Sequence, residues 1–163
     1  MDDFSDMPHR PTQVIERAED YAELCRHLRD VREFAFDTEF VTEDTFTPVL
    51  CLVQVATADR LAIVDPLAVP ELGDFWSLVA EPSNQVVAHA ADAEIRFCRH
   101  YLGRPPSPIF DVQIAAGLAG YGYPLSYTNL VRRVLGQTVK GSETRTEWRR
   151  RPLTEKQVHY ALE

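Results

Sequence analysis

A short apolar segment that carries two acidic residues constrains this chain most. Residues 34–40 read Phe-Ala-Phe-Asp-Thr-Glu-Phe, and their aromatic and small side chains predict a buried β-strand. Asp37 and Glu39 are two residues apart, so on a strand both carboxylates point to the same face. Two such acids repel each other and are costly to desolvate. The segment therefore predicts either a magnesium or manganese site, or an edge strand whose polar face is solvated.

Length and composition favour one soluble globular domain, with 163 residues, 45% hydrophobic and 26% charged. The sequence shows neither an apolar run of membrane-spanning length nor a signal-peptide pattern, and residues 1–11 are expected to form a flexible leader. The three cysteines, Cys25, Cys51 and Cys98, are far apart and odd in number. This spacing disfavours a zinc site and a disulfide framework, and a cytoplasmic location is expected. Cys51 and Cys98 are predicted to be buried small hydrophobes.

Charge is distributed unevenly along the chain. The net charge of −8 argues against a general attraction to nucleic acid, but residues 132–151 carry seven basic and only two acidic side chains. This block indicates either a surface that binds a polyanion or a solvated arginine-rich face.

Hydrophobic periodicity and turn residues predict an α/β protein. A helix capped by Thr12 is expected over 12–30, three consecutive strands over 34–40, 50–56 and 61–65, and a hairpin turn over 57–60. Further elements are a helix from Pro70 to Val79, a strand over 85–90, and helices over 92–101, 112–119, 126–135 and from Thr154 onward, with a short strand over 109–111. This order favours a mixed sheet flanked by helices. No Gly-rich phosphate loop follows a strand, which disfavours a Rossmann or P-loop domain.

Four sequence motifs together resemble a known enzyme family. They are Asp37-Thr38-Glu39, the run His89-Ala90-Ala91-Asp92-Ala93-Glu94, the basic run from Lys140 to Pro152, and Tyr160 on the last helix. In combination they resemble ribonuclease D and its relatives, the four-carboxylate (DEDD) 3′–5′ exonucleases of the tyrosine subclass. The resemblance covers residues 12–163 and implies an RNase-H-like (DnaQ-like exonuclease) fold.

The resemblance also implies a chemistry, namely release of single nucleotides from the 3′ end of RNA by an activated water. Two divalent metal ions, Mg²⁺ or Mn²⁺, would lie about 3.5–4 Å apart and hold the attacking and leaving oxygens. Asp37, Glu39 and Glu94 would be metal ligands and catalytic residues, and Tyr160 would orient the water. The implied partner is a single-stranded RNA or DNA 3′ end. The sequence indicates no membrane association and identifies no protein partner.

The second motif departs from the family pattern. The family places Asp five residues after the histidine, where this chain has Glu94, which carries its charge about 1.5 Å further out. Magnesium demands near-ideal octahedral geometry, so this shift bears on catalysis. The alternative is that Glu94 is only a helix-face acid and Asp92 an N-cap. Asp111 is interpreted as the cap of helix 112–119, and His89 as a structural histidine with its hydrogen bonds satisfied.

The third motif is incomplete in this sequence. The family pattern is Tyr followed four residues later by Asp, one helical turn away, and the chain stops three residues after Tyr160. Glu163 is one position early, about 100° around the helix, and is a poor substitute. We therefore expect residues 12–163 to be a C-terminally incomplete exonuclease domain of a longer protein. In that protein residue 164 would be the fourth carboxylate and a further domain would follow.

Basic and aromatic residues near the acidic motifs are candidates for nucleic-acid binding. Arginines and a lysine of the basic block would contact phosphates, and Trp148 would either stack on a base or fix its loop to the body. Phe40 is expected beneath the terminal base. The candidates are Phe40, Lys140, Arg145, Trp148 and Arg149, joined by Arg150 and Arg151. Two alternatives stay open: a DNA 3′–5′ exonuclease, and a catalytically impaired nucleic-acid-binding module on the same fold.

Overall fold

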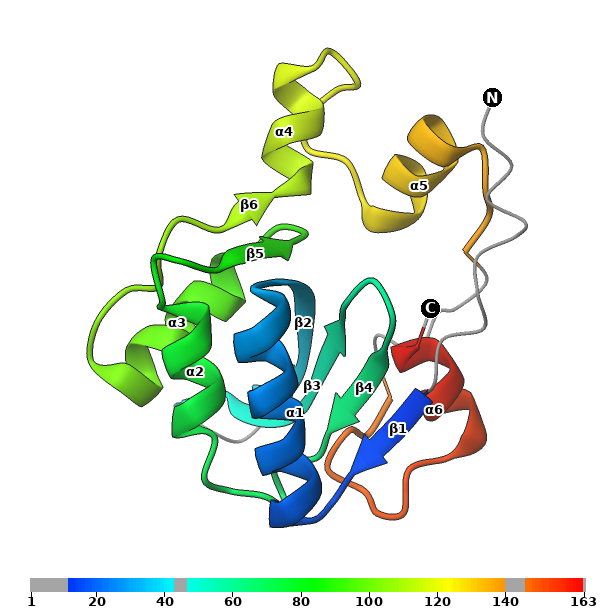
Figure 1. Ribbon diagram of the computed structural model, residues 1–163. Helices are drawn as coiled ribbons and strands as arrows, with labels where there is room; N and C mark the ends of the chain where they lie inside the picture. Colours follow the sequence, from blue (N-terminus) through cyan, green and yellow to red (C-terminus); the bar gives the residue numbers. More distant parts are fainter. Residues whose placement is uncertain (1–11, 43–46, 140–145, 163) are drawn as a thin grey trace.

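The computed structural model describes residues 12–42, 47–139 and 146–162 and contains a six-stranded mixed sheet in the order β1-β4-β3-β2-β5-β6 (Figure 1). Strands β2, β3 and β4 form an antiparallel meander, whereas β5 pairs in parallel with β2 and β6 in parallel with β5. The strand bounds are β1 Thr12–Ile15, β2 Glu33–Val41, β3 Val49–Ala56, β4 Leu61–Val64, β5 Gln85–Ala88 and β6 Phe110–Asp111. This topology confirms the predicted mixed sheet, and the β3–β4 hairpin closes through Thr57 N donating to Arg60 O at 2.9 Å.

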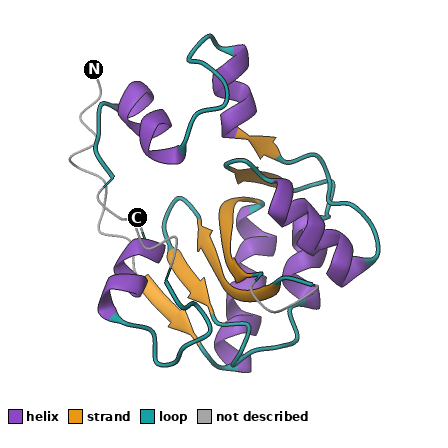
Figure 2. Cartoon of the chain, turned by 180° about the vertical axis from the view of Figure 1, so that it is seen from behind, coloured by secondary structure: helices purple, strands orange, loops and turns teal. Residues whose placement is uncertain are grey.

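Three helices cover one face of the sheet, as the front and back views both show (Figures 1 and 2). They are α1 Ala18–Val31, α2 Gly73–Val79 and α3 Asp92–Leu102. Phe34 and Phe36 of β2 pack there against Phe75 of α2, and Phe40 packs edge-on against Phe97 of α3. This layer forms the main hydrophobic core.

The remaining helices lie elsewhere around the sheet. Helix α6 Glu155–Ala161 packs with the segment before it in a second core that includes Cys51, Ile63 and Trp148. Helices α4 Val112–Leu118 and α5 Tyr127–Leu135 share a small core of their own and stand apart from the sheet in Figure 1. As predicted, Asp111, Ser126 and Thr154 cap α4, α5 and α6 with their side chains.

One predicted element is wrong at its start. Residues 12–15 are not the first turn of a helix but strand β1, which pairs in parallel with Leu61–Val64, and α1 begins only at Ala18. The side chains of Val14 and Ile15 fit a helical spacing and a strand equally well, and the partner strand lies about fifty residues away in sequence. Helix α2 also begins at Gly73, three residues after the predicted Pro70. Across the described residues, no helix is long and apolar enough to cross a membrane.

Candidate metal centre and active site

The two acids of β2 lie where this strand passes the end of its neighbour. Pairing with β5 extends only from Glu33 to Ala35, whereas pairing with β3 continues past Glu39. The part of β2 that carries Asp37 and Glu39 therefore has β3 on one side only, and α3 starts near its other side. Both acids thus lie near the carboxyl ends of parallel strands, the usual place for a ligand site in an open α/β sheet.

Glu94 joins these acids from the first turn of α3. Its side chain is only 3% exposed, and one carboxylate oxygen accepts a hydrogen bond of 2.6 Å from the Thr38 hydroxyl. Asp92, in contrast, is exposed and pairs with Arg96 at 2.8 Å, and the N-cap of α3 is Ala91. The alternative with a capping Asp92 and an outward Glu94 is therefore wrong. We call Asp37, Glu39 and Glu94 the carboxylate cluster.

The pKa values of all three acids in the cluster are raised. Burial, followed by the charge of Asp37, raises the pKa of Glu39 to about 8, and Glu94 adds to this effect. Burial raises the pKa of Glu94 to about 7, with the hydrogen bond from Thr38 opposing the shift and the charge of Asp37 adding to it. The pKa of Asp37 is also raised, mainly by desolvation, against hydrogen bonds from the Thr38 amide and with Glu94. All three carboxyls therefore have raised pKa values, a shift that a nearby cation would oppose.

Tyr160 reaches the cluster from α6, more than a hundred residues after the two acids of β2 in the chain. A hydrogen bond from its side chain lowers the pKa of Glu39, against the larger effect of burial. Its ring lies 5.9 Å from that of Trp148, centroid to centroid, in the second core. The structure thus brings together all four residues that the sequence predicted as catalytic.

Two further predictions near the cluster are confirmed. The ring of His89 shares a hydrogen bond of 2.9 Å with the Leu125 carbonyl, so its role as a satisfied structural histidine holds. Asp111 caps α4 through hydrogen bonds to the amides of Gln113 and Ile114. Cys51 and Cys98 are buried and free, as predicted for small hydrophobes, and so is Cys25.

The predicted nucleic-acid-binding residues differ in how far they are exposed to solvent. Trp148 is 1% exposed, so it cannot stack on a base, and the alternative that it fixes its loop to the body is correct. Phe40 is partly exposed but packs into the main core. Arg149 is exposed and pairs with Glu147 at 3.2 Å. Lys140 and Arg145 lie outside the described residues.

Arg151 was expected on a phosphate-binding surface, and this expectation is wrong. Its guanidinium pairs with Asp65, which is 1% exposed, with one contact of 2.8 Å. It also donates to the carbonyls of Cys51 and Trp148. These bonds account for most of its donors, so Arg151 holds the loop before α6 against the sheet.

Comparison with known proteins gives this geometry a family. A profile of the 3′–5′ exonuclease family matches residues 12–163. The chain belongs to this family. It is 44% identical to ribonuclease D of Shewanella sp. (strain ANA-3) over 125 residues, which cover 77% of this chain and 32% of that protein. Identity to ribonuclease D of Nitrobacter hamburgensis is 39% over 150 residues, or 91% of this chain and 39% of the relative.

The fold of this exonuclease domain agrees with solved relatives. The crystal structure of Escherichia coli RNase D superposes with a TM-score of 0.86 at 33% identity, over 93% of this chain and 40% of that one. The catalytic core of RRP6 from Trypanosoma brucei gives a TM-score of 0.84 at 25% identity, over 94% and 42%. The predicted RNase-H-like fold is therefore confirmed. The chain spans about a third to two fifths of the length of these relatives.

The donor set of this exonuclease domain fits a hard divalent cation. Carboxylate oxygens are what Mg²⁺ and Mn²⁺ prefer, and the raised pKa of Glu39 and Glu94 is the property that a cation would reverse. Within residues 12–42, 47–139 and 146–162, no three His, Cys, Asp or Glu side chains, those of the carboxylate cluster included, are arranged as a ready-made metal site. An open donor set suits magnesium, which keeps several waters and is completed by substrate phosphates.

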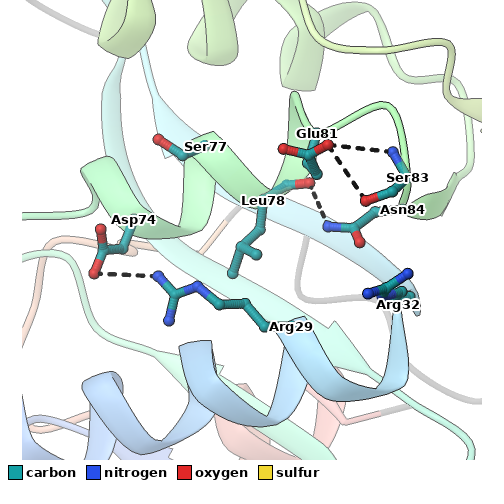
Figure 3. A pocket seen from close by; sticks show the side chains of 8 residues that line it. All are labelled: Arg29, Arg32, Asp74, Ser77, Leu78, Glu81, Ser83 and Asn84. Carbon is teal, nitrogen blue, oxygen red and sulfur yellow. Dashed lines mark hydrogen bonds and ion pairs between the residues drawn. The ribbon is translucent and has the colours of Figure 1, made fainter.

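The structure also has a pocket that lies away from the carboxylate cluster. It lies between the end of α1, helix α2 and the turn before β5 (Figure 3). Arg29 and Asp74 pair across it at 3.7 Å, and Asn84 donates to the Leu78 carbonyl. No member of the carboxylate cluster lines it, so we do not assign the active site there.

Sequence reasoning missed two residues that support the cluster. Gln54 lies opposite Asp37 in the β2–β3 pairing and forms a side-chain hydrogen bond that lowers the pKa of Glu39. A polar residue inside the otherwise apolar strand 50–56 was the signal that could have found it. Thr38 is 6% exposed and bonds Glu94, but the two are 56 positions apart, and no local pattern predicts their contact.

Proposed function

We propose that the protein containing this chain is a metal-dependent 3′–5′ exonuclease that shortens RNA from its 3′ end. The family membership establishes the exonuclease class, and the ribonuclease D relatives support RNA as the substrate. Hydrolysis through two divalent ions, with Asp37, Glu39 and Glu94 as ligands, is the finer part of the proposal.

The observation that carries this proposal is the convergence of three carboxyls and one tyrosine hydroxyl. They come from β2, α3 and α6, elements far apart in sequence. Besides burial, the charge of Asp37 raises the pKa of both Glu39 and Glu94, the charge of Glu94 raises that of Glu39, and Tyr160 hydrogen-bonds to Glu39. Glu94 is buried beside the half-buried Glu39 and the exposed Asp37, and a fold that only needed stability would gain little from gathering like charges in this way.

Each side chain has a role in the proposed reaction. Bound divalent cations would supply Lewis-acid polarisation of the phosphate and a nucleophilic water at neutral pH. Asp37, Glu39 and Glu94 would hold these cations, and the Tyr160 hydroxyl would orient the attacking water. Water attacks the terminal phosphorus and the bond to the preceding 3′ oxygen breaks. That oxygen takes up a proton, so a nucleoside 5′-monophosphate leaves and a new 3′-hydroxyl remains.

A second candidate is a catalytically impaired nucleic-acid-binding module, and Glu94 is what favours it. Glu94 stands where the family pattern has Asp, and one of its oxygens is held by Thr38 at 2.6 Å. An oxygen engaged in a short hydrogen bond is a weaker ligand, and magnesium tolerates little displacement. Glu94→Asp tests this candidate, because it shortens the side chain without changing its charge.

The experiment uses the full-length protein with a 5′-labelled single-stranded RNA and the matching DNA, in Mg²⁺, Mn²⁺ or EDTA. A metal-dependent ladder that shortens from the 3′ end supports the exonuclease, and the ratio of RNA to DNA cleavage fixes the substrate. Binding of RNA without a ladder in either metal, together with a ladder from Glu94→Asp, would establish the impaired module instead.

A further inference from the structure

The carboxylate of Asp111 contacts two separate elements at once. Oδ1 accepts hydrogen bonds from the amides of Gln113 at 2.8 Å and Ile114 at 3.4 Å, which caps α4. The same carboxylate also accepts from the amide of Ala90 at 3.1 Å through Oδ1 and from that of Ala91 at 3.0 Å through Oδ2. Four amide donors lower the pKa of Asp111 despite its partial burial.

Ala90 has a backbone conformation that alanine rarely adopts. Its φ is 56°, in the left-handed region where a Cβ atom is unfavourable. Its carbonyl accepts a hydrogen bond of 2.8 Å from the Asp92 amide, so the turn between β5 and α3 is tight. The Asp111 carboxylate therefore holds the amides of the strained Ala90 and of its neighbour Ala91, the N-cap of α3. We call these two hydrogen bonds the clamp.

The turn determines where α3 begins, and with it the position of Glu94. Glu94 lies three residues after Ala91, in the first helical turn, and reaches Thr38 of β2 from there. A change in the φ of Ala90 would rotate the start of α3 and move the Glu94 carboxyl relative to Asp37 and Glu39. The position of a magnesium ligand is sensitive to such a shift.

We infer that Asp111 is a positioning residue for the metal centre: by clamping the Ala90–Ala91 turn, it sets the place of the Glu94 carboxylate. This inference rests on the proposed function. A cap on α4 alone would need only one carboxylate oxygen, and Ser or Asn would serve as well. The second oxygen, bonded to Ala91, is what distinguishes the two roles.

The test uses variants of the full-length protein that keep the α4 cap and lose all or part of the clamp. In Asp111→Ser the hydroxyl still caps the helix but is too short to span both elements. In Asp111→Asn an NH₂ group, a donor, replaces Oδ2, so the bond from the Ala91 amide is lost while the remaining oxygen can still accept from Ala90, Gln113 and Ile114. Ser126→Ala, which removes the cap of the neighbouring α5, is the matched control for capping. Mn²⁺ affinity is measured by titration calorimetry, and activity on labelled RNA separately, with kcat and KM resolved.

We expect both Asp111 variants to bind Mn²⁺ about 10-fold more weakly or worse and to lose kcat, while Ser126→Ala changes affinity less than about 2-fold. Adding Ala90→Gly to Asp111→Ser should restore most of the affinity, because glycine adopts a positive φ without strain. Wild-type Mn²⁺ affinity in both Asp111 variants, or a loss equal to that of Ser126→Ala, would overturn the inference. If the Asp111 variants do not fold, Ala90→Val gives the same test with the α4 cap intact.

The outcomes separate this inference from the proposed function. A wild type that binds Mn²⁺ through Asp37 but cleaves no RNA contradicts the function, and the affinities of the variants still decide the role of Asp111. Conversely, normal cleavage with unchanged Mn²⁺ binding in Asp111→Ser contradicts the positioning role alone. A wild type that binds no Mn²⁺ through Asp37 contradicts both.

Discussion

The carboxylate cluster and the arginine segment, which we define as residues 146–151, both stand out by charge, yet the structure uses them differently. In the arginine segment, Arg151 meets the buried acid Asp65 and two carbonyls, so its charge is neutralised within the protein. In the cluster, the charge of a neighbouring acid raises the pKa of Glu39 and of Glu94, and His89 lowers the pKa of Asp37 only against the larger effect of burial. A charged residue paired with an opposite charge holds the fold, whereas a group of like charges with raised pKa values is typical of a functional site.

The largest expected effect comes from removing a charge from the cluster. Asp37→Asn in the full-length protein should reduce metal-dependent trimming of RNA by more than about 100-fold, since a ligand should matter more than its outer-shell partners. Asp92→Asn is the matched control, because Asp92 lies near Glu94 on α3 but is exposed and pairs with Arg96 on the surface. A rate for Asp37→Asn close to that of Asp92→Asn would mean that the cluster is not the active site.

Removing the tyrosine hydroxyl should have the next largest effect on the rate. Tyr160→Phe keeps the ring that packs beside Trp148 but loses the hydrogen bond to Glu39. We expect kcat to fall about 100-fold, in the range of a lost proton-transfer or water-orienting group, with KM and melting temperature little changed. The assay is single-turnover cleavage of labelled RNA. A fall in melting temperature with an unchanged rate would assign Tyr160 to the core instead.

In the arginine segment, Arg151 should contribute to the stability of the fold and not directly to catalysis. Arg151→Ala leaves Asp65 buried without its partner, which should lower the free energy of unfolding by about 3 kcal/mol. The neighbouring Arg150 is exposed, so Arg150→Ala should change it by less than about 0.5 kcal/mol. Urea unfolding of both variants measures the difference. Equal midpoints would show that the Asp65–Arg151 pair does not stabilise the fold.

The smallest effect is a pH dependence that should distinguish the cluster from ordinary surface acids. The folded-state pKa of Glu39 is about 8 and that of Glu94 about 7, above the ordinary value of a free glutamate. The folded metal-free protein therefore holds protons that the unfolded chain releases, and its stability should fall as pH rises from about 4.5 to about 8. Cations bind the deprotonated cluster, so the stabilisation by Mn²⁺ should be larger at about pH 8.5 than at about pH 6.

Thermal melts at the two pH values, with and without Mn²⁺, test this prediction. Asp37→Asn serves as the control, since it removes part of the repulsion and a ligand. An Mn²⁺-induced rise in melting temperature that is equal at both pH values would contradict the raised pKa values of Glu39 and Glu94.

Local sequence signals predicted most of the elements and the candidate acids Asp37 and Glu39, whereas Glu94 and Tyr160 became candidates through the resemblance to the exonuclease family. Asp37 and Glu39 could be predicted because a strand fixes which side chains share a face. The caps Asp111, Ser126 and Thr154 could be predicted because capping depends on neighbouring residues. The errors concern long-range partners. Strand β1 needs β4, and Arg151 needs Asp65, 86 positions away. A basic run looks the same in sequence whether its arginines face solvent or a buried acid.

The most direct test of the central claim is the position of the bound metal. Crystals of the full-length protein grown with Mn²⁺ would be measured at a wavelength where manganese scatters anomalously. We predict anomalous density in contact with the carboxylates of Asp37, Glu39 and Glu94, and its loss in Asp37→Asn. Density at other residues, or none at the cluster under conditions where the same protein cleaves RNA, would contradict this account of the active site.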